Sequence, residues 1–145
     1  MAKILILEDD TVFAGLVRRD LEEAGHRASV AATGHEALEL VIAEAFDAAI
    51  VDVYIKVDGR LTSDGGVLFI SRLRTLLAET GHATRTDIPV LAVSGAARAG
   101  MPYDILGTTR KLGADDVLPK PFAPQVLREK LDALLSGQRG HGRAP

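Results

Sequence analysis

Hydrophobic and polar positions fall into short blocks along the chain, and these blocks predict alternating strands and helices. Short apolar runs without polar alternation are typical of strands that are covered on both faces in a parallel sheet. Such runs, or a weaker form of them, occupy residues 3–7, 27–32, 48–52, 88–93 and 116–119. We therefore predict five strands, buried by helices on both sides of one sheet.

Helical segments are predicted in the intervals between these strands. They cover residues 11–24, 33–45, 64–80 and 124–136, with a further short helix over 103–112. Gly25 is placed to end the first helix, Thr33 and Glu36 have the spacing of a capping box, and Pro124 suits a first helical turn. The residues expected to face the sheet are Phe13, Leu16, Val17, Leu21 and Ala24; Leu38, Val41 and Ile42; Val67, Ile70, Leu73 and Leu77; and Leu127, Leu131 and Leu134.

The order of these elements predicts the fold class. Five strands that alternate with five helices imply right-handed crossovers and an α/β fold with a doubly wound parallel sheet. For five strands the natural candidate is the flavodoxin-like order 2-1-3-4-5, in which strands 1 and 3 are neighbours at the switch point. We expect one domain over residues 1–137 and a disordered tail over residues 138–145.

Composition narrows the classes of function. The chain is 47% hydrophobic and 26% charged, with a net charge of -3 and a pI near 5.8. This balance provides no overall attraction to the phosphate backbone of nucleic acid, so direct binding to nucleic acid is not expected. Because the chain has no cysteine, it uses neither disulfides nor a thiolate site.

The hydrophobic pattern also bears on location. The first predicted strand begins at Lys3, which leaves no room for a signal peptide, and no apolar run approaches the roughly 20 residues that a membrane span needs. We expect a cytoplasmic protein that does not enter a membrane.

Polar residues stand at the carboxyl ends of the predicted strands. Glu8 and Asp9 follow the first strand, Asp52 ends the third, Ser94 follows the fourth and Lys120 follows the last. Open α/β sheets bind ligands beyond the carboxyl ends of their strands, at the point where strand order reverses. We therefore predict that the three acids converge, with the hydroxyl and the amine on their other side.

Three carboxylates in one place repel one another, so they stay ionised only beside a cation. Oxygen ligands without His or Cys favour Mg²⁺, which one or two carboxylates commonly hold together with a phosphate of the substrate. A carboxylate is also an established nucleophile for phosphoryl transfer. We expect Lys120 and Mg²⁺ to neutralise a phosphoryl group, and Ser94 to donate a hydrogen bond to it.

Each of these residues also has a purely structural explanation. Asp9 or Asp10 could cap the first helix, and for Asp10 this is the explanation that we favour. Lys120 by itself would be a surface charge, and Ser94 followed by glycine is an ordinary turn signal. Convergence of acids from separate segments is what helix capping does not require, and it favours a functional site.

The constellation resembles the receiver domains of two-component response regulators, over residues 3 to about 136. Each motif is short, but five of them occur in the family's order. The motifs are Leu7-Glu8-Asp9-Asp10, Val51-Asp52, Asp64-Gly65, Val93-Ser94-Gly95 and Pro119-Lys120-Pro121-Phe122.

The resemblance implies a function and roles for individual residues. A histidine kinase or a phosphotransfer protein would donate a phosphoryl group to Asp52. Asp9 and Asp52 would bind Mg²⁺ directly, Tyr54 would contribute its backbone carbonyl, and Glu8 would act through water.

Two further residues receive roles from the same resemblance. Ser94 would be the switch hydroxyl. Lys120 would be the family's lysine, and a cis peptide bond is expected between it and Pro121.

The sequence departs from the family pattern in three places. Eleven residues separate Asp52 from Asp64, so the connection 54–63 is longer than usual, and a second Asp-Gly pair lies within it at residues 58–59. We favour Asp64 as the helix start, because the helical stripe begins directly after it. The interval after Ser94 is also extended, at residues 95–102.

Val117 stands where many relatives carry an aromatic switch residue. Rotation of an aromatic ring therefore cannot be the output mechanism here. We expect movement of the 95–102 loop to transmit the signal instead.

The leading hypothesis is a single-domain receiver, a phosphorylation switch without a separate enzymatic activity. It would signal to a downstream protein through a face built from the 103–112 helix, the 116–119 strand and the last helix, as a monomer or a phosphorylation-dependent dimer. One alternative is a phosphorylation-incompetent interaction module of the same fold. Another is a small phosphatase with an aspartate nucleophile, which would need a general acid and a lid that the sequence does not clearly provide.

Overall fold

The computed structural model describes residues 1–53, 55–57, 60–62, 64–76, 81–94 and 113–137. Five strands form one parallel sheet in the order β2-β1-β3-β6-β7. They are β1 (Lys3–Leu7), β2 (Arg27–Ala31), β3 (Ala48–Asp52), β6 (Val90–Ser94) and β7 (Asp116–Pro119). This order is the flavodoxin-like order predicted from the sequence.

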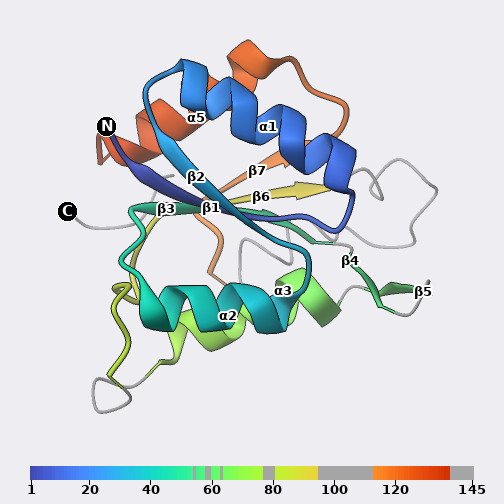
Figure 1. The fold of residues 1–145 in the computed structure, drawn as a ribbon, viewed down its shortest axis with the longest axis vertical. Helices are drawn as coiled ribbons and strands as arrows, with labels where there is room; N and C mark the ends of the chain where they lie inside the picture. Colours follow the sequence, from blue (N-terminus) through green and yellow to red (C-terminus); the bar gives the residue numbers. More distant parts are fainter. Residues whose placement is uncertain (54, 58–59, 63, 77–80, 95–112, 138–145) are drawn as a thin grey trace.

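Helices cover both faces of the sheet (Figure 1). They are α1 (Thr11–Glu23), α2 (Gly34–Ala43), α3 (Asp64–Arg74) and α5 (Pro124–Leu135). The helix α1 packs with α5 on one face, and α2 packs with α3 on the other. The helix predicted over 103–112 and the disorder predicted over 138–145 lie outside the described residues.

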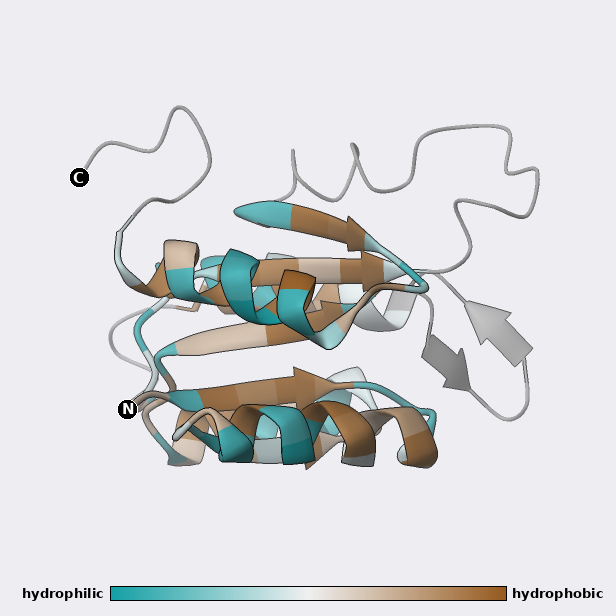
Figure 2. Cartoon of the chain, turned by 90° about the horizontal axis from the view of Figure 1, so that it is seen from above, coloured by the Kyte–Doolittle hydropathy of each residue, from teal (hydrophilic) through white to brown (hydrophobic). Residues whose placement is uncertain are grey.

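Alternate residues of each strand supply two separate cores. Ile4 and Ile6 of β1 face α1 and α5, whereas Leu5 and Leu7 face α2 and α3. Seen from above, apolar segments run along the strands behind the nearer helices (Figure 2). Because both faces are covered, the strands read as continuous apolar runs, as the sequence pattern indicated.

Local signals explain where helices start and stop. The Thr33 hydroxyl accepts a hydrogen bond from the backbone N–H of Glu36, and the Glu36 carboxylate accepts one from Ala32. The helix α1 ends at Glu23, where Gly25 adopts a positive φ of 94°. These boundaries agree with the predicted capping box and with the predicted glycine stop.

Three residues expected to face the sheet do not. Leu16 is 61% exposed and Ile42 is 38% exposed, and Ala24 is exposed beyond the end of α1. In α1 the buried stripe consists of Ala14, Val17 and Leu21, which puts Leu16 at the margin of the covered face. Helical spacing alone did not distinguish this margin from the stripe. Phe69 of α3 is buried although it was not predicted to be.

Residues 54–63 were expected to form a loop, and the structure corrects this expectation. The strands β4 (Ile55–Val57) and β5 (Arg60–Thr62) pair as an antiparallel two-stranded sheet directly after β3. An Asp-Gly pair between two such runs is a strong hairpin signal, so the sequence carried this information. The helix α3 begins at Asp64, as predicted, and residues 77–80 of the predicted helix are outside the described part.

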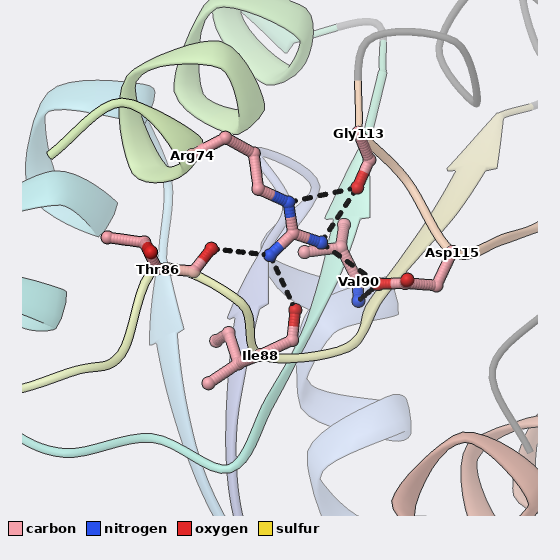
Figure 3. A network of polar contacts seen from close by, with 6 residues as sticks. All are labelled: Arg74, Thr86, Ile88, Val90, Gly113 and Asp115. Atoms are coloured by element: carbon pink, nitrogen blue, oxygen red, sulfur yellow. Dashed lines mark hydrogen bonds and ion pairs between the residues drawn. The ribbon is translucent and has the colours of Figure 1, made fainter. Parts of the chain in front are cut away.

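The amino-terminal edge of the sheet is held together by Arg74, the last residue of α3 (Figure 3). Its Nη1 donates to the carbonyl oxygens of Thr86 and Ile88, each at 2.7 Å. Its Nε and Nη2 donate to the carbonyl of Gly113, at 3.0 and 2.7 Å. One guanidinium group thus links α3 to the segments that lead into β6 and β7.

A buried carboxylate completes this network. Arg74 Nη2 lies 2.9 Å from Oδ2 of Asp115, whose side chain is fully buried, and the same oxygen accepts the backbone N–H of Val90 at 2.8 Å. Removing one partner of such a pair leaves the other charge buried and uncompensated, which costs much more than a surface pair is worth.

We predict that Arg74→Met lowers the free energy of unfolding by about 3 to 5 kcal/mol, because the Asp115 carboxylate loses its charged partner. Urea denaturation followed by circular dichroism measures this loss. Arg72→Met is the matched control, because Arg72 is exposed on the same helix and its replacement should change stability by less than about 0.5 kcal/mol. Equal stabilities of the two variants would contradict the assignment.

Candidate functional site

Three acidic residues from two separate segments of the chain meet at the carboxyl edge of the sheet. Leu7 pairs with Val51 in the register of β1 and β3. The residues that follow them, Glu8 and Asp52, therefore lie side by side. One carboxylate oxygen from each of Glu8, Asp9 and Asp52 lies within 4.8 Å of the others. Glu8 and Asp52 are buried, and Asp9 is half-buried.

Lys120 connects two of these acids from the other side. Its Nζ lies 2.6 Å from Oε1 of Glu8 and 2.9 Å from Oδ2 of Asp52. Its backbone N–H donates to the carbonyl of Ser94 at 2.9 Å, and the peptide bond to Pro121 is cis, as expected. The backbone of Lys120 is therefore held by Ser94, and its ammonium group is paired with two carboxylates.

The electrostatics of the cluster are unbalanced. Burial raises the pKa of Glu8 from 4.5 to about 8, and the neighbouring charge of Asp52 adds to the rise, while the hydrogen bond from Lys120 opposes it. Burial by itself lowers the pKa of Lys120, but hydrogen bonds to the two carboxylates and their charges raise it above 10.5. Lys120 is thus charged at neutral pH, and one cation serves two buried acids.

The acidic loop also forms the start of α1. Oδ1 of Asp10 accepts the backbone N–H groups of Val12 and Phe13, each at 3.0 Å, which is the capping role predicted for it. The backbone N–H of Asp10 donates to Oε2 of Glu8 at 3.1 Å. Both oxygens of Glu8 are therefore engaged, one by Lys120 and one by the loop.

The structure describes only some of the other residues predicted to belong to the site. Ser94 is buried at the end of β6, beside Val93, which pairs with Asp52. Val117 is half-buried in β7. Tyr54 and the 95–102 loop lie outside the described residues.

Gly66 allows α3 to approach the strand that carries Asp52. A Cβ atom at this position would lie 2.1 Å from the carbonyl oxygen of Asp52 and 2.9 Å from its carbonyl carbon. Both atoms belong to backbone, which cannot move aside as a flexible side chain can. The absence of a side chain at Gly66 thus sets how closely α3 packs behind Asp52.

The donor set fits a divalent cation of the Mg²⁺ type. The three side chains offer hard oxygen ligands from one small volume. Mg²⁺ is commonly held by one or two carboxylates with waters filling the remaining positions. Asp9 and Asp52 satisfy that requirement.

Comparison with known proteins shows the family to which the chain belongs. Residues 4–132 match the model of the response regulator receiver domain, and the chain belongs to this family. The chain is 32% identical over 134 residues to the response regulator MprA of Mycolicibacterium vanbaalenii, across 92% of this chain and 50% of that protein. It therefore spans about half the length of the curated relatives that it matches.

Solved structures agree with this assignment. A CheY-like receiver domain protein from Methanospirillum hungatei has a TM-score of 0.75 and 25% identity, and the match covers 95% of this chain and 96% of that one. The Vibrio cholerae chemotaxis protein CheY4 has a TM-score of 0.73 and 26% identity, and the match covers 92% of this chain and 98% of that one.

Within the described residues, no helix is long and apolar enough to cross a membrane.

One neighbour of the site was missed in the sequence. Phe13 was assigned only to the buried stripe of α1, yet its ring lies 4.4 Å from Nζ of Lys120, measured to the ring centroid. No spacing rule links two residues so far apart in the chain. Only the packing of α1 with α5 on one face of the sheet, next to the segment that leads from β7 into α5, brings them together.

We predict that Gly66→Ala lowers the free energy of unfolding by about 1 to 3 kcal/mol, because the added methyl group overlaps the Asp52 backbone. Gly15→Ala is the control: Gly15 lies inside α1, and a methyl group added there would have no neighbouring atom within 4 Å. That change should stabilise the protein by about 0.5 to 1 kcal/mol. Thermal and urea unfolding distinguish the two signs, and a stabilising Gly66→Ala would contradict the close approach.

A pH dependence follows from the raised pKa of Glu8. Because the folded protein holds this proton more tightly than the unfolded chain, its contribution to stability is complete below pH 4.5 and is lost as the pH rises through about 8. In a chelating buffer, the unfolding free energy of the wild type should therefore fall more steeply over this window than that of Glu8→Gln. Glu23→Gln, which removes an exposed charge beside Arg19, should follow the wild type; parallel wild-type and Glu8→Gln curves would refute the shift.

Proposed function

We propose that this protein is a receiver that accepts a phosphoryl group on Asp52 from a histidine kinase or a phosphotransfer protein. Its membership of the receiver family supports this. The observation that carries the proposal is the buried Asp52 carboxylate, which lies 2.9 Å from the Lys120 ammonium and beside Glu8 and Asp9. Structural capping would not require this convergence.

The chemistry asked of these residues is positioning and charge neutralisation. An oxygen of Asp52 forms a bond to phosphorus while the bond from phosphorus to the donor's imidazole nitrogen breaks, and that nitrogen keeps the electron pair. When the other ring nitrogen of the donor carries a proton, the ring leaves as neutral imidazole, and this chain need not supply a general acid for the step. Hydrolysis of the acyl phosphate by water later returns Asp52 and inorganic phosphate, which makes the modification a reversible switch.

Asp9 and Asp52 would hold Mg²⁺ directly, with the Tyr54 carbonyl as a further ligand and Glu8 acting through water. When bound, the ion neutralises the oxygens of the transferred group. The chain's own residues do the rest. Glu8 keeps Lys120 beside Asp52 through its 2.6 Å contact, and the burial of Asp52 limits access of water.

The switch would work through movement of Lys120 and Ser94. A phosphoryl group adds negative charge and acceptor oxygens at Asp52, and these would draw the Lys120 ammonium and the Ser94 hydroxyl toward it. Lys120 follows β7 directly, and its backbone is bonded to Ser94 at the end of β6. Their movement would alter the surface of β7 and α5, where a downstream protein would bind.

We predict that the wild type becomes phosphorylated when it is incubated with Mg²⁺ and a small phosphodonor such as acetyl phosphate. Intact-mass spectrometry measures the addition of one phosphoryl group. Asp52→Asn should fall to background, because an amide is not a nucleophile for this reaction, and a chelator should have the same effect on the wild type. Asp10→Asn is the matched control, since asparagine also caps a helix.

Two results would remove the proposal. One is an unmodified wild type under conditions that phosphorylate a known receiver, which would favour the interaction module without phosphorylation. The other is modification of Asp52→Asn at the wild-type rate. Sustained turnover of a phosphate ester would instead favour the small phosphatase.

A further inference from the structure

The Lys120 ammonium has a third neighbour besides its two carboxylates, the aromatic ring of Phe13. Nζ lies 4.4 Å from the ring centroid, well within the range of a cation–π contact. The same atom lies 2.6 Å from Glu8 and 2.9 Å from Asp52. The ring therefore contacts the ammonium group in addition to its two carboxylates, and the Lys120 side chain is left 21% exposed.

Phe13 is itself held in place from two directions. Its backbone N–H donates to the Asp10 carboxylate at 3.0 Å, in the first turn of α1. Its ring meets the ring of Phe122 edge to face, with centroids 5.7 Å apart and planes at 78°. Phe122 follows Lys120 by two residues, so the lysine and the support of its platform come from one short segment.

An aromatic face suits this position for a physical reason. The four-carbon stem of lysine is flexible, and holding it in one place costs rotamer entropy. The negative face of the ring attracts the ammonium group but does not compete for its N–H donors as a carboxylate or a water would. The ring thus takes no N–H donor away from the two carboxylates or from an incoming phosphoryl oxygen, while the ammonium group stays beside Asp52.

We propose that Phe13 is a positioning residue for Lys120: its ring face holds the ammonium group where a phosphoryl group on Asp52 will need it. The inference rests on the proposed function, phosphoryl transfer to Asp52. The competing explanation is packing alone. Phe13 also lines a cavity of about 160 Å³ between α1 and α5, together with Leu16, Val17 and Leu127, and any apolar side chain could serve that purpose.

Stepwise fluorination of the ring separates the two explanations. Phenylalanines with one, two and three fluorine atoms, incorporated at position 13, keep the ring's shape but weaken its negative face. We expect the initial rate of Asp52 phosphorylation by acetyl phosphate to fall steadily along the series, by roughly 3- to 10-fold at its end. The same series at position 122 is the matched control and should change the rate little, because this ring contacts Phe13 and no Lys or Arg of the described residues lies over it.

A double-mutant cycle tests the contact between Phe13 and Lys120 without phosphorylation. Phe13→Leu and Lys120→Met, singly and together, are compared by urea unfolding in a chelating buffer. If the ring attracts the ammonium group, the two stability changes are not additive, and the double variant loses less than the sum. Phe122→Leu with Lys120→Met gives the corresponding control cycle.

The outcomes separate this inference from the function on which it rests. If the wild type is phosphorylated and every member of the position-13 series is phosphorylated at the same rate, Phe13 acts by packing alone, and the proposed function stands. Additive changes in the Phe13–Lys120 cycle would overturn the inference in the same way. A wild type that takes up no phosphoryl group would remove the proposed function, and the inference with it.

Discussion

The charge balance at the carboxyl edge of the sheet is the constraint on which the rest of the structure depends. Parallel strands end at the same edge, so the topology itself makes neighbours of Glu8 and Asp52. Two buried carboxylates repel each other, and one ammonium group, that of Lys120, is shared between them. Burial, and after it the neighbouring charge of Asp52, raises the pKa of Glu8, so a cation placed beside these carboxylates would favour their ionised forms.

The surrounding elements hold this unfavourable arrangement in place. The loop that carries Glu8 also begins α1, because Asp10 caps the helix and donates its own N–H to Glu8. The helix α3 packs directly behind Asp52 because Gly66 has no side chain. At the opposite edge, Arg74 and Asp115 form a buried network whose charges are paired. Stability and chemistry are thus placed at opposite ends of the strands, as is usual where a functional site conflicts with local stability.

Some features could be read from the sequence because they depend on local chemistry. The strands were recognisable since both faces of the sheet are covered, and the caps at Asp10 and Thr33 follow from side chains that bond the nearest backbone. The hairpin after Asp52 was also readable from its Asp-Gly pair, although we predicted a loop there. Leu16 was misplaced because helical periodicity does not fix the width of the buried stripe, and 61% of its surface is exposed.

What the sequence determined by itself is the order of the elements and the residue types at the strand ends, because hydrophobic periodicity and the rules of parallel crossovers depend on neighbouring residues and chain direction. These were enough to place Glu8, Asp9, Asp52 and Lys120 at one edge. Only the tertiary structure decided which atoms meet there: that one ammonium group serves two acids, and that the ring of Phe13 lies against it. Such contacts join segments far apart in the chain, and their geometry is set by how the helices pack against the sheet.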